Sequence, residues 1–330
     1  MRACYTVANV EIGMAKPQSK QPDLTAPGGQ VIRPTIAARL YEEAQAMELA
    51  DAKAAGTIGF MGRALVQATL PYREPSADLR AWGRRAGNVS LVIQPGMYFD
   101  ENNEAQSIGF PYGSYPRLLL AWIATEAFRT KSRQLVLGNR LTDFLESLGY
   151  TSQNGGPRGN ITRIREQMKR LFAAHIAIVY GGGQGSDFAH KPFLIADDTE
   201  LWWDPQRPDQ AGLWQSTVTL SERFYDEVVS TPVPIDLRAL RALRQSPMAL
   251  DLYCWLTYRM FSLKAPVTVP WEALKLQFGS EAGRDRKFKE GISKQLQQVL
   301  SVYPAGVRPT KAGLELSPSK TSVPRLVTDW

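Results

Sequence analysis

The sequence predicts an α+β protein built from two successive modules of the same kind. The same order of helices and strands occurs twice, about 130 residues apart, and each copy contains an amphipathic helix with a cationic face. Lys and Arg are also concentrated in the two corresponding regions of the chain. With 330 residues, the protein is long enough to form one large domain or two domains with well-packed cores.

Charge is distributed unevenly along the chain, whose formal net charge is +7. Residues 111–175 hold 10 basic and 4 acidic side chains, residues 176–235 hold 3 and 9, and residues 236–330 hold 15 and 8. Two basic regions therefore flank an acidic one. This pattern favours two separate contact surfaces for a polyanion, although a solvated basic face would have the same composition.

We divide the chain into three parts. Residues 1–55 form an N-terminal arm that ends in a helix: the part before Gln30 is rich in Pro and Gly and is predicted to be flexible, and the helix spans 34–55. Residues 56–233 form the first module, in which 57–98 read as short strands and turns, including a strand over Ala64–Leu70. Residues 234–330 form the second module.

In the first module, a long helix begins near Pro116 and is followed by a strand, a short helix and a third helix that leads into a hairpin. The predicted elements after the long helix are the strand Leu135–Leu137, the helix 139–148, the helix 160–174, and a hairpin that starts with Ile176–Tyr180 and turns at Gly181–Gly183.

The second module repeats this order. Its predicted elements are the helix Pro247–Phe261, the strand Val267–Val269, the helix Trp271–Phe278, a helix that contains Phe288–Val299, and a hairpin over Val307–Leu316. A helix-turn-helix followed by a β-hairpin is the arrangement of a winged helix, and the fold class is therefore two tandem winged-helix domains.

The helix 160–174 is predicted to read DNA. Its buried stripe consists of Ile161, Ile164, Met168, Leu171 and Phe172. The other side carries Thr162, Arg163, Glu166, Lys169 and Arg170. Asn160, Arg165 and, in the loop before the helix, Arg158 are also predicted to contact DNA. On this face Arg163, Glu166 and Arg170 are placed to contact bases, while Arg158, Arg165 and Lys169 are placed to hold phosphates. A solvated amphipathic helix is the alternative.

The corresponding helix of the second module has the same construction. Phe288, Ile292, Leu296 and Val299 form its buried stripe. The predicted base-facing residues are Lys287, Glu290, Lys294 and Gln298, and the predicted phosphate contacts are Arg284, Arg286 and Lys289.

Several kinds of chemistry are disfavoured by the sequence. Neither glycine cluster ends in the Gly-Lys-Ser/Thr of a phosphate-binding loop, and two His and two Cys cannot form a zinc cluster by themselves. Asp197, Asp198 and Glu200 leave open a metal-dependent nucleic-acid enzyme, but a solvated acidic loop is the simpler interpretation. His175 is expected to continue the buried stripe of its helix, and Cys254 to be a packing residue. We therefore expect no enzyme activity, no cofactor and no metal.

The chain is also expected to lie in the cytoplasm and not in a membrane. No apolar run reaches the roughly 18 residues that a membrane-spanning helix requires. The positions of Cys4 and Cys254 do not suggest a disulfide framework, which fits a reducing compartment.

Particular stretches of the chain resemble plasmid-encoded replication initiators of the RepA type. The matching stretches are Gly59–Met61 through Leu70–Pro71, Pro111–Arg117, Trp203–Pro205, Pro234–Leu240 and, most fully, Ser246–Arg259. The resemblance covers residues from about Gly56 to Gly313. It implies a tandem winged-helix protein that binds direct repeats in the double-stranded DNA of a plasmid origin (iterons) and melts the adjacent DNA.

The same resemblance implies that the protein recruits the host initiator and the replicative helicase. A homodimer is a further partner that this interpretation allows. The alternative function is a winged-helix transcriptional regulator that represses its own promoter, because the same fold and the same DNA-reading helices would serve both roles.

Overall fold

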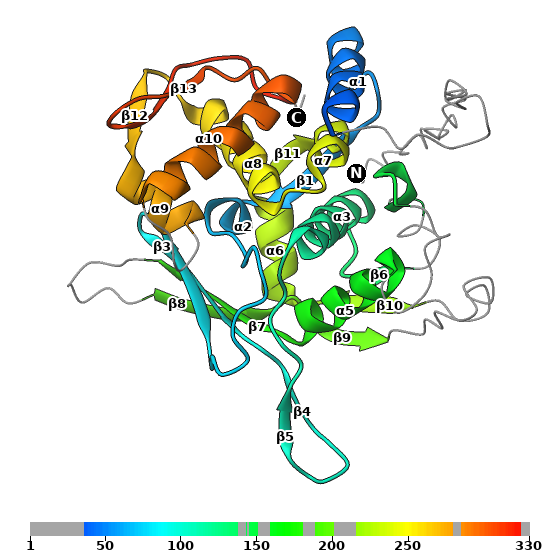
Figure 1. Cartoon of the computed structure of the whole chain (residues 1–330). Coiled ribbons are helices and arrows are strands. Elements are labelled where there is room, and N and C mark those ends of the chain that lie inside the picture. Colours follow the sequence, from blue (N-terminus) through cyan, green and yellow to red (C-terminus); the bar gives the residue numbers. More distant parts are fainter. Residues whose placement is uncertain are drawn as a thin grey trace, which may run out of the picture.

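The computed structural model describes residues 36–137, 143, 145–150, 159–180, 189–200, 216–279 and 285–324. Over these residues the protein is a mixed α/β structure in which helices pack against small antiparallel sheets (Figure 1). The predicted flexible arm before Gln30 lies outside the described residues. No described helix is both long and apolar enough to cross a lipid bilayer.

Helix α1, Ile36–Leu49, is the predicted N-terminal helix, but it packs against the C-terminal part of the chain. Its neighbours are α7, Leu237–Leu243, and α10, Asp285–Val302. Arg39 donates hydrogen bonds of 3.2 and 3.0 Å to the carbonyl oxygen of Ala242, which anchors α1 to α7. The helix that ends the predicted N-terminal arm is therefore part of the same packing unit as the second module.

A two-stranded ribbon joins the beginning of the first predicted module to the beginning of the second. Strand β1, Ile58–Gly62, pairs antiparallel with β11, Pro232–Asp236. The next element is helix α2, Arg63–Gln67, so the predicted strand over Ala64–Leu70 is wrong. The error has a physical reason, since a short continuous apolar run has no periodicity that distinguishes a buried strand from a buried helix.

The N-terminal half contains the other predicted elements together with additional strands. They are β2 Trp82–Ala86, β3 Val89–Gln94, β4 Met97–Phe99, β5 Ala105–Ser107, α3 Ser114–Thr130, β6 Gln134–Val136, α5 Asn160–Ala173, β7 His175–Tyr180, β8 Ala189–Leu194, β9 Ala196–Glu200 and β10 Thr217–Leu220. Strands β2, β3, β7 and β8 form a four-stranded sheet in that order, and β6, β10 and β9 form a three-stranded sheet. Within the predicted helix 139–148, residues 145–147 are helical, whereas most of the rest and the turn at Gly181–Gly183 lie outside the described residues.

Two local predictions in this half are wrong. His175 does not continue the stripe of a helix, because α5 ends at Ala173 and His175 is an exposed residue of strand β7. The acidic residues Asp197 to Glu200 do not form a loop, because they belong to strand β9, which pairs with β10. In both cases a polar residue or segment is held in a strand by backbone pairing with a distant segment, which local patterns do not reveal.

The C-terminal half follows the prediction closely. Its elements are α6 Glu222–Ser230, α8 Pro247–Ser262, β12 Val267–Pro270, α9 Trp271–Phe278, β13 Val307–Pro309 and β14 Gly313–Leu316, in addition to β11, α7 and α10. Helix α8 begins where Ser246 accepts a hydrogen bond of 3.2 Å from the amide of Ala249, which is the geometry of an N-cap. Strands β12, β14 and β13 form a sheet in that order. Cys254 is buried in α8, as predicted, and burial raises the pKa of its thiol.

One buried ion pair joins the two halves. Arg117 of α3 contacts both carboxylate oxygens of Asp251 of α8 at 2.8 Å. The same guanidinium donates to the carbonyl oxygens of Leu70, Pro71 and Gly113 at 2.6, 3.1 and 2.6 Å. The side chains are only 5% and 9% exposed. The carboxylate and the three carbonyl oxygens thus satisfy the buried guanidinium, and the ion pair holds α3 against α8.

Removing one partner of this pair should be strongly destabilising. Asp251→Ala leaves the Arg117 guanidinium buried without a counter-charge, and we expect a loss of about 3–5 kcal/mol in the free energy of unfolding, measured by urea denaturation. The control is Glu315→Ala, because Glu315 pairs at 2.9 Å with Arg308, which is 74% exposed, and such a pair contributes less than about 1 kcal/mol. Equal losses for the two variants would contradict the role given to Asp251.

Candidate nucleic-acid interface

Helix α5 has one buried and one exposed face, as its sequence predicts. Ile164, Met168 and Leu171 are 1%, 2% and 0% exposed and hold the helix against the core. Phe172 is also buried, whereas the side chain of Ile161 lies outside the described residues.

The polar residues of α5 differ in their exposure. Thr162 and Arg165 are half-buried. The exposed polar side chains within the helix are those of Arg163, Glu166 and Lys169. Of these, Glu166 and Lys169 lie 3.8 Å apart, so the face is cationic with one internal ion pair.

Arg170 and Arg163 have different environments, although they are seven positions apart and therefore lie on the same side of the helix. Its Nη1 pairs with Glu74 at 2.5 Å and donates to the carbonyl oxygen of Phe110 at 3.4 Å. Its guanidinium also lies 5.3 Å from the centre of the Tyr112 ring. With its side chain 17% exposed, Arg170 attaches α5 to the neighbouring segments instead of facing solvent.

The N-terminal end of α5 is also held by a side chain of α3. Tyr115 donates a hydrogen bond of 2.9 Å to Oδ1 of Asn160, the first residue of α5. Burial raises the pKa of Tyr115, while the nearby Arg163 guanidinium acts in the opposite direction. Asn160 is therefore half-buried and bonded within the protein, whereas Arg163 remains exposed one turn further on.

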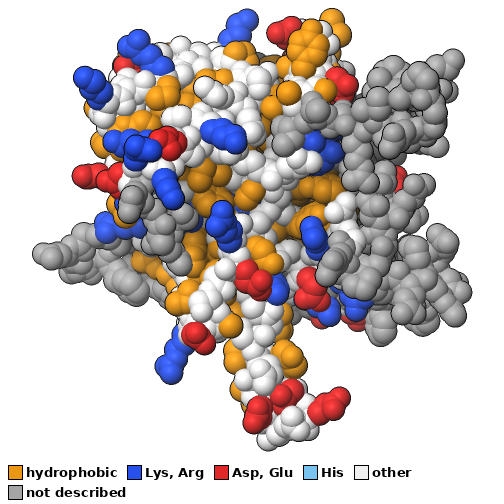
Figure 2. Space-filling view, in the orientation of Figure 1, with side chains coloured by type: hydrophobic (Ala, Val, Ile, Leu, Met, Phe, Trp, Pro, Cys, Tyr) orange, Lys and Arg blue, Asp and Glu red, His pale blue; other side chains and the backbone are white. Residues whose placement is uncertain are grey.

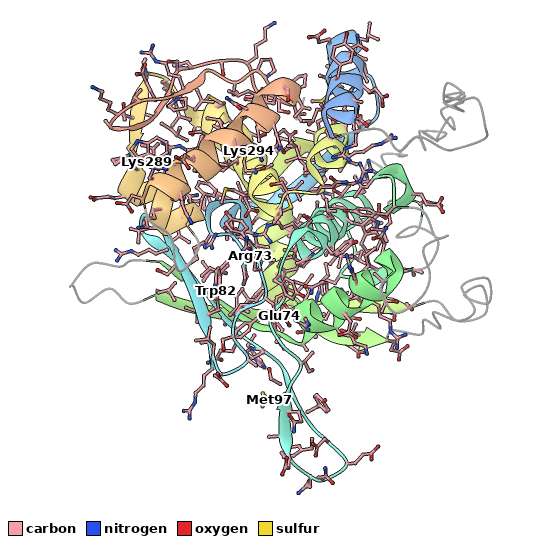
Figure 3. The ribbon with its side chains drawn as sticks, viewed as in Figure 1. Arg73, Glu74, Trp82, Met97, Lys289 and Lys294 are labelled. Atoms are coloured by element: carbon pink, nitrogen blue, oxygen red, sulfur yellow. The ribbon has the colours of Figure 1, made fainter. Side chains whose placement is uncertain are left out.

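Helix α10 is built in the same way. Ile292, Leu296 and Val299 are buried, and Phe288 is half-buried, so the predicted stripe is confirmed. The opposite face carries exposed Lys287, Glu290 and Lys294, with Gln298 half-buried. Figure 3 shows Lys289 and Lys294 on this helix.

The predicted phosphate-contacting residues flank this face. Arg286 pairs with Glu290 at 3.1 Å, and their side chains are 88% and 63% exposed, so solvent screens the pair. The ammonium group of Lys289 lies 5.4 Å from the centre of the Trp271 ring, which orients it at the start of α9. Arg158 and Arg284 lie outside the described residues.

The segment 71–75 lies between the two helices. Glu74 reaches α5 through its ion pair with Arg170, and the neighbouring Arg73 is exposed. Arg73 lines a cleft of about 780 Å³ together with Lys287 of α10. In Figure 3 Arg73 and Glu74 lie next to each other below α10, and Figure 2 shows Lys and Arg side chains distributed over this face of the molecule. The segment therefore adds a cation, Arg73, between the faces of α5 and α10.

The acidic residues considered as metal ligands are not gathered into one site. On strand β9 the side chains of Asp197 and Asp198 point to opposite faces of the sheet. Asp197 pairs with Arg133 at 2.6 Å. Among the described residues there is no group of three or more His, Cys, Asp or Glu side chains suited to holding a metal ion.

A comparison with models of known protein families matches a segment of the chain that contains both α3 and α8. The family model described as plasmid encoded RepA protein matches residues 110–272. The chain is RepA-like over this segment. The resemblance predicted from Pro111–Arg117 and Ser246–Arg259 is therefore confirmed, and the match contains α3, α5 and α8 but ends before α10.

Two other comparisons add little. Among curated proteins, none matches the chain. The crystal structure of SeMet derivatives of domain 2 and domain 3 of RctB has a TM-score of 0.47 and 12% sequence identity, over 71% of this chain and 82% of that one.

Sequence reasoning missed Arg73 and Glu74. The stretch from Pro71 to Pro75 reads only as a turn between two prolines, and nothing in it indicates that one residue would pair with α5 and the next would face α10. The adjacent Tyr72 ring packs between the guanidinium groups of Arg84 and Arg117, whose carbon atoms lie 4.7 and 5.1 Å from its centre. This contact fixes the segment to the buried ion pair.

The close packing of Arg170 should be sensitive to a methyl group at Gly109. Gly109 has φ of +91°, and an added Cβ would lie 3.1 Å from the Arg170 guanidinium, so Gly109→Ala should lower the free energy of unfolding by about 1 kcal/mol or more. Gly291→Ala is the control, because its Cβ meets nothing within 4 Å and alanine favours the helix by up to about 1 kcal/mol. Urea denaturation measures both variants, and a stabilising effect of Gly109→Ala would contradict this packing.

Proposed function

We propose that this protein is a plasmid replication initiator that binds specific duplex DNA through α5 and α10. The observation that carries the proposal is the presence, in a RepA-like chain, of two helices that each bury an apolar stripe and expose a cationic face. A helix of this kind fits the major groove, where Arg and Lys contact guanine and Glu accepts from cytosine.

The proposal includes a winged helix in the C-terminal half. The order α8, β12, α9, α10, β13, β14, with β14 between β12 and β13 in the sheet, supports it. In this arrangement α9 and α10 are the helix-turn-helix, and β13 and β14 are the wing.

The N-terminal half supports a modified version of the same fold. Helix α3, strand β6, helix α5 and the hairpin β7–β8 follow the same order. Two features differ: β10 lies between β6 and β9, and the hairpin β2–β3 extends the sheet at the outer edge of β7. We propose that these additional strands widen the first wing without changing the position of α5 in front of it.

Within this interface we assign roles according to the contacts of each side chain. Arg163 and Glu166 of α5, and Lys287 and Lys294 of α10, are exposed and are assigned to bases. Arg165, Lys169, Arg286 and Lys289 are assigned to phosphates, together with Arg73 from the intervening segment. Arg170 and Asn160, which are bonded to Glu74 and Tyr115, are assigned to positioning α5.

The remaining parts of the function are proposals that rest on the resemblance to RepA-type initiators. The protein would bind direct repeats at a plasmid origin, promote melting of the adjacent DNA and recruit the host initiator and replicative helicase. We also propose that it does so without catalysing a reaction, since Asp197 is paired with Arg133 and points away from Asp198. Magnesium-dependent cleavage or synthesis of DNA by the purified protein would contradict this part.

The first test is footprinting on the noncoding DNA that flanks the gene, over a series of salt concentrations and with unrelated DNA as competitor. Periodic protection over direct repeats, with affinity that falls steeply as salt rises, is the expected result. Protection confined to the promoter would instead favour a transcriptional repressor, and binding without any footprint would contradict sequence-specific recognition.

Two substitutions separate base contacts from phosphate contacts. Arg163→Ala should weaken binding to the specific site by about 1–3 kcal/mol and relax the base preference at one position, since a bidentate contact to guanine would be lost. Arg73→Ala should weaken binding to specific and unrelated DNA alike and reduce the slope of log affinity against log salt by about 1.

The matched control for both is Lys53→Ala, which removes one exposed positive charge from the turn between α1 and β1. Fluorescence anisotropy with specific and unrelated duplexes measures all three variants. If Arg163→Ala lowered affinity equally for both duplexes, the assignment of Arg163 to a base would be wrong.

A further inference from the structure

Arg84 of strand β2 joins the two halves of the protein at a second point, besides the ion pair between α3 and α8. Its Nη1 donates a hydrogen bond of 3.3 Å to the carbonyl oxygen of Gln277, and its Nη2 donates one of 2.9 Å to that of Gly279. Both carbonyl groups lie at the C-terminal end of α9. In the opposite direction, Nε2 of Gln277 donates one of 2.8 Å to the carbonyl oxygen of Gln67. Arg84 is only 8% exposed, so this contact is part of the interior.

The end of α9 is a suitable acceptor for a guanidinium group. The last carbonyl groups of a helix have no partner within the helix, and the helix dipole gives them a partial negative charge. In its own half, Arg84 lies over the rings of Tyr72 and Trp82, whose centres are 4.7 and 4.9 Å from its Cζ. Its Nη1 also donates to Oγ1 of Thr69 at 2.8 Å. These contacts hold the guanidinium in one orientation toward α9.

On one side of Arg84, backbone pairing leads to α5. Arg84 is paired with Leu91 of β3, and Leu91 with Ile178 of β7, so these three residues form a row across the sheet. Leu91 and Ile178 are 0% and 2% exposed. Strand β7 begins at His175, just after α5 ends at Ala173. The position of α5 is therefore tied to that of Arg84 through the sheet.

On the other side, α9 is fixed to α10. Lys275 of α9 pairs with Asp285, the first residue of α10, at 2.5 Å. The rings of Trp271 and Phe288 pack edge to face, with 6.5 Å between their centres. In Figure 1 the cyan strands of the sheet reach α9 from below, and β2 contacts this helix. Arg84 thus belongs to a series of contacts that runs from α5 to α10.

We propose that Arg84 is a positioning residue that sets the distance and the angle between α5 and α10. The ion pair of Arg117 and Asp251 places α8, whereas Arg84 holds α9, the first helix of the proposed helix-turn-helix. Loss of the Arg84 contact allows α9 and α10 to shift together relative to the sheet that follows α5.

The consequence for DNA rests on the proposed function, in which α5 and α10 each bind one segment of a duplex. Each added base pair rotates the second segment by about 34° around the duplex axis and moves it by about 3.4 Å. Two helices held at a fixed distance and angle therefore accept one spacing of the two segments. Arg84 is buried, so it acts on this spacing through the two helices and not by touching DNA.

The role of Arg84 within the protein is tested without DNA, by double electron–electron resonance between spin labels on α5 and α10. The labels are attached through Glu166→Cys and Gln297→Cys, because both side chains are exposed. Cys4→Ser removes a competing thiol, whereas Cys254 is buried and stays. The otherwise wild-type chain should give one narrow distance distribution, and Arg84→Ala should broaden or shift it.

Arg39→Ala is the matched control. Arg39 is also 8% exposed and also donates to a carbonyl group at the end of a helix, that of Ala242 in α7. It joins α1 to α7, however, and lies outside the contacts that connect α5 with α9. The control variant should therefore leave the distance distribution unchanged, although it loses a contact of the same kind.

Arg84→Lys is a second variant, which keeps the measurement decisive if Arg84→Ala fails to fold. Lysine retains a cation over the two rings but lacks the planar fork that reaches both carbonyl groups. The distance distribution of Arg84→Lys should therefore still be broader than that of the wild type.

The consequence for DNA is tested by fluorescence anisotropy with duplexes that carry one extra base pair between the two protected segments. The insertion should lower the affinity of the wild type by at least about tenfold, because one module then loses base contacts. For Arg84→Ala the same insertion should lower the affinity by less than about threefold, since α10 can follow the displaced segment. Arg39→Ala should respond to the insertion as the wild type does.

The proposal would be overturned by a distance distribution that is the same for the wild type, Arg84→Ala and Arg84→Lys, or by equal broadening in Arg39→Ala. A broadened distribution with an undiminished effect of the insertion would overturn the link to DNA spacing. If the wild type bound no specific DNA, the proposed function would fail, but the distance measurement would still decide the role of Arg84 within the protein.

Discussion

The contact between Arg117 and Asp251 is the interaction on which the rest of the structure depends. It joins the two long helices α3 and α8, and it also holds the backbone at Leu70 and Pro71. A buried guanidinium is tolerated only where its charge and its N–H groups are satisfied, and here a carboxylate and three carbonyl oxygens do so. This requirement determines the relative position of the two modules and of the segment that crosses between them.

The candidate interface follows from this arrangement. Because Pro71 is held by Arg117, the residues that follow it lie between α5 and α10, where Glu74 pairs with Arg170 and Arg73 lines the cleft with Lys287. One short segment thus orients one DNA-reading helix and supplies a cation beside the other. The same contacts distinguish Arg163 from Arg170 on α5, since Arg163 faces solvent and Arg170 is bonded within the protein.

The helices α3, α5, α8, α9 and α10 could be predicted from the sequence because their causes are local. The stripe of Ile292, Leu296 and Val299 has the period of a helix, and Ser246 supplies the cap of α8 through contacts three residues away. The prediction of α2 as a strand was wrong because its apolar residues are consecutive. The prediction that His175 continues the buried stripe of its helix was wrong because α5 ends where β7 begins to pair with β3.

The sequence by itself determined the two amphipathic helices, their cationic faces and the family resemblance, since each of these depends on residue type and spacing along a short stretch. Only the tertiary structure decided which of the cations are exposed and which are bonded internally. Arg163 and Arg170 are equivalent in a helical projection, but their environments differ because Glu74, about 96 residues from Arg170, lies beside only one of them. Contacts over such separations are set by the packing of whole helices, and no local pattern records them.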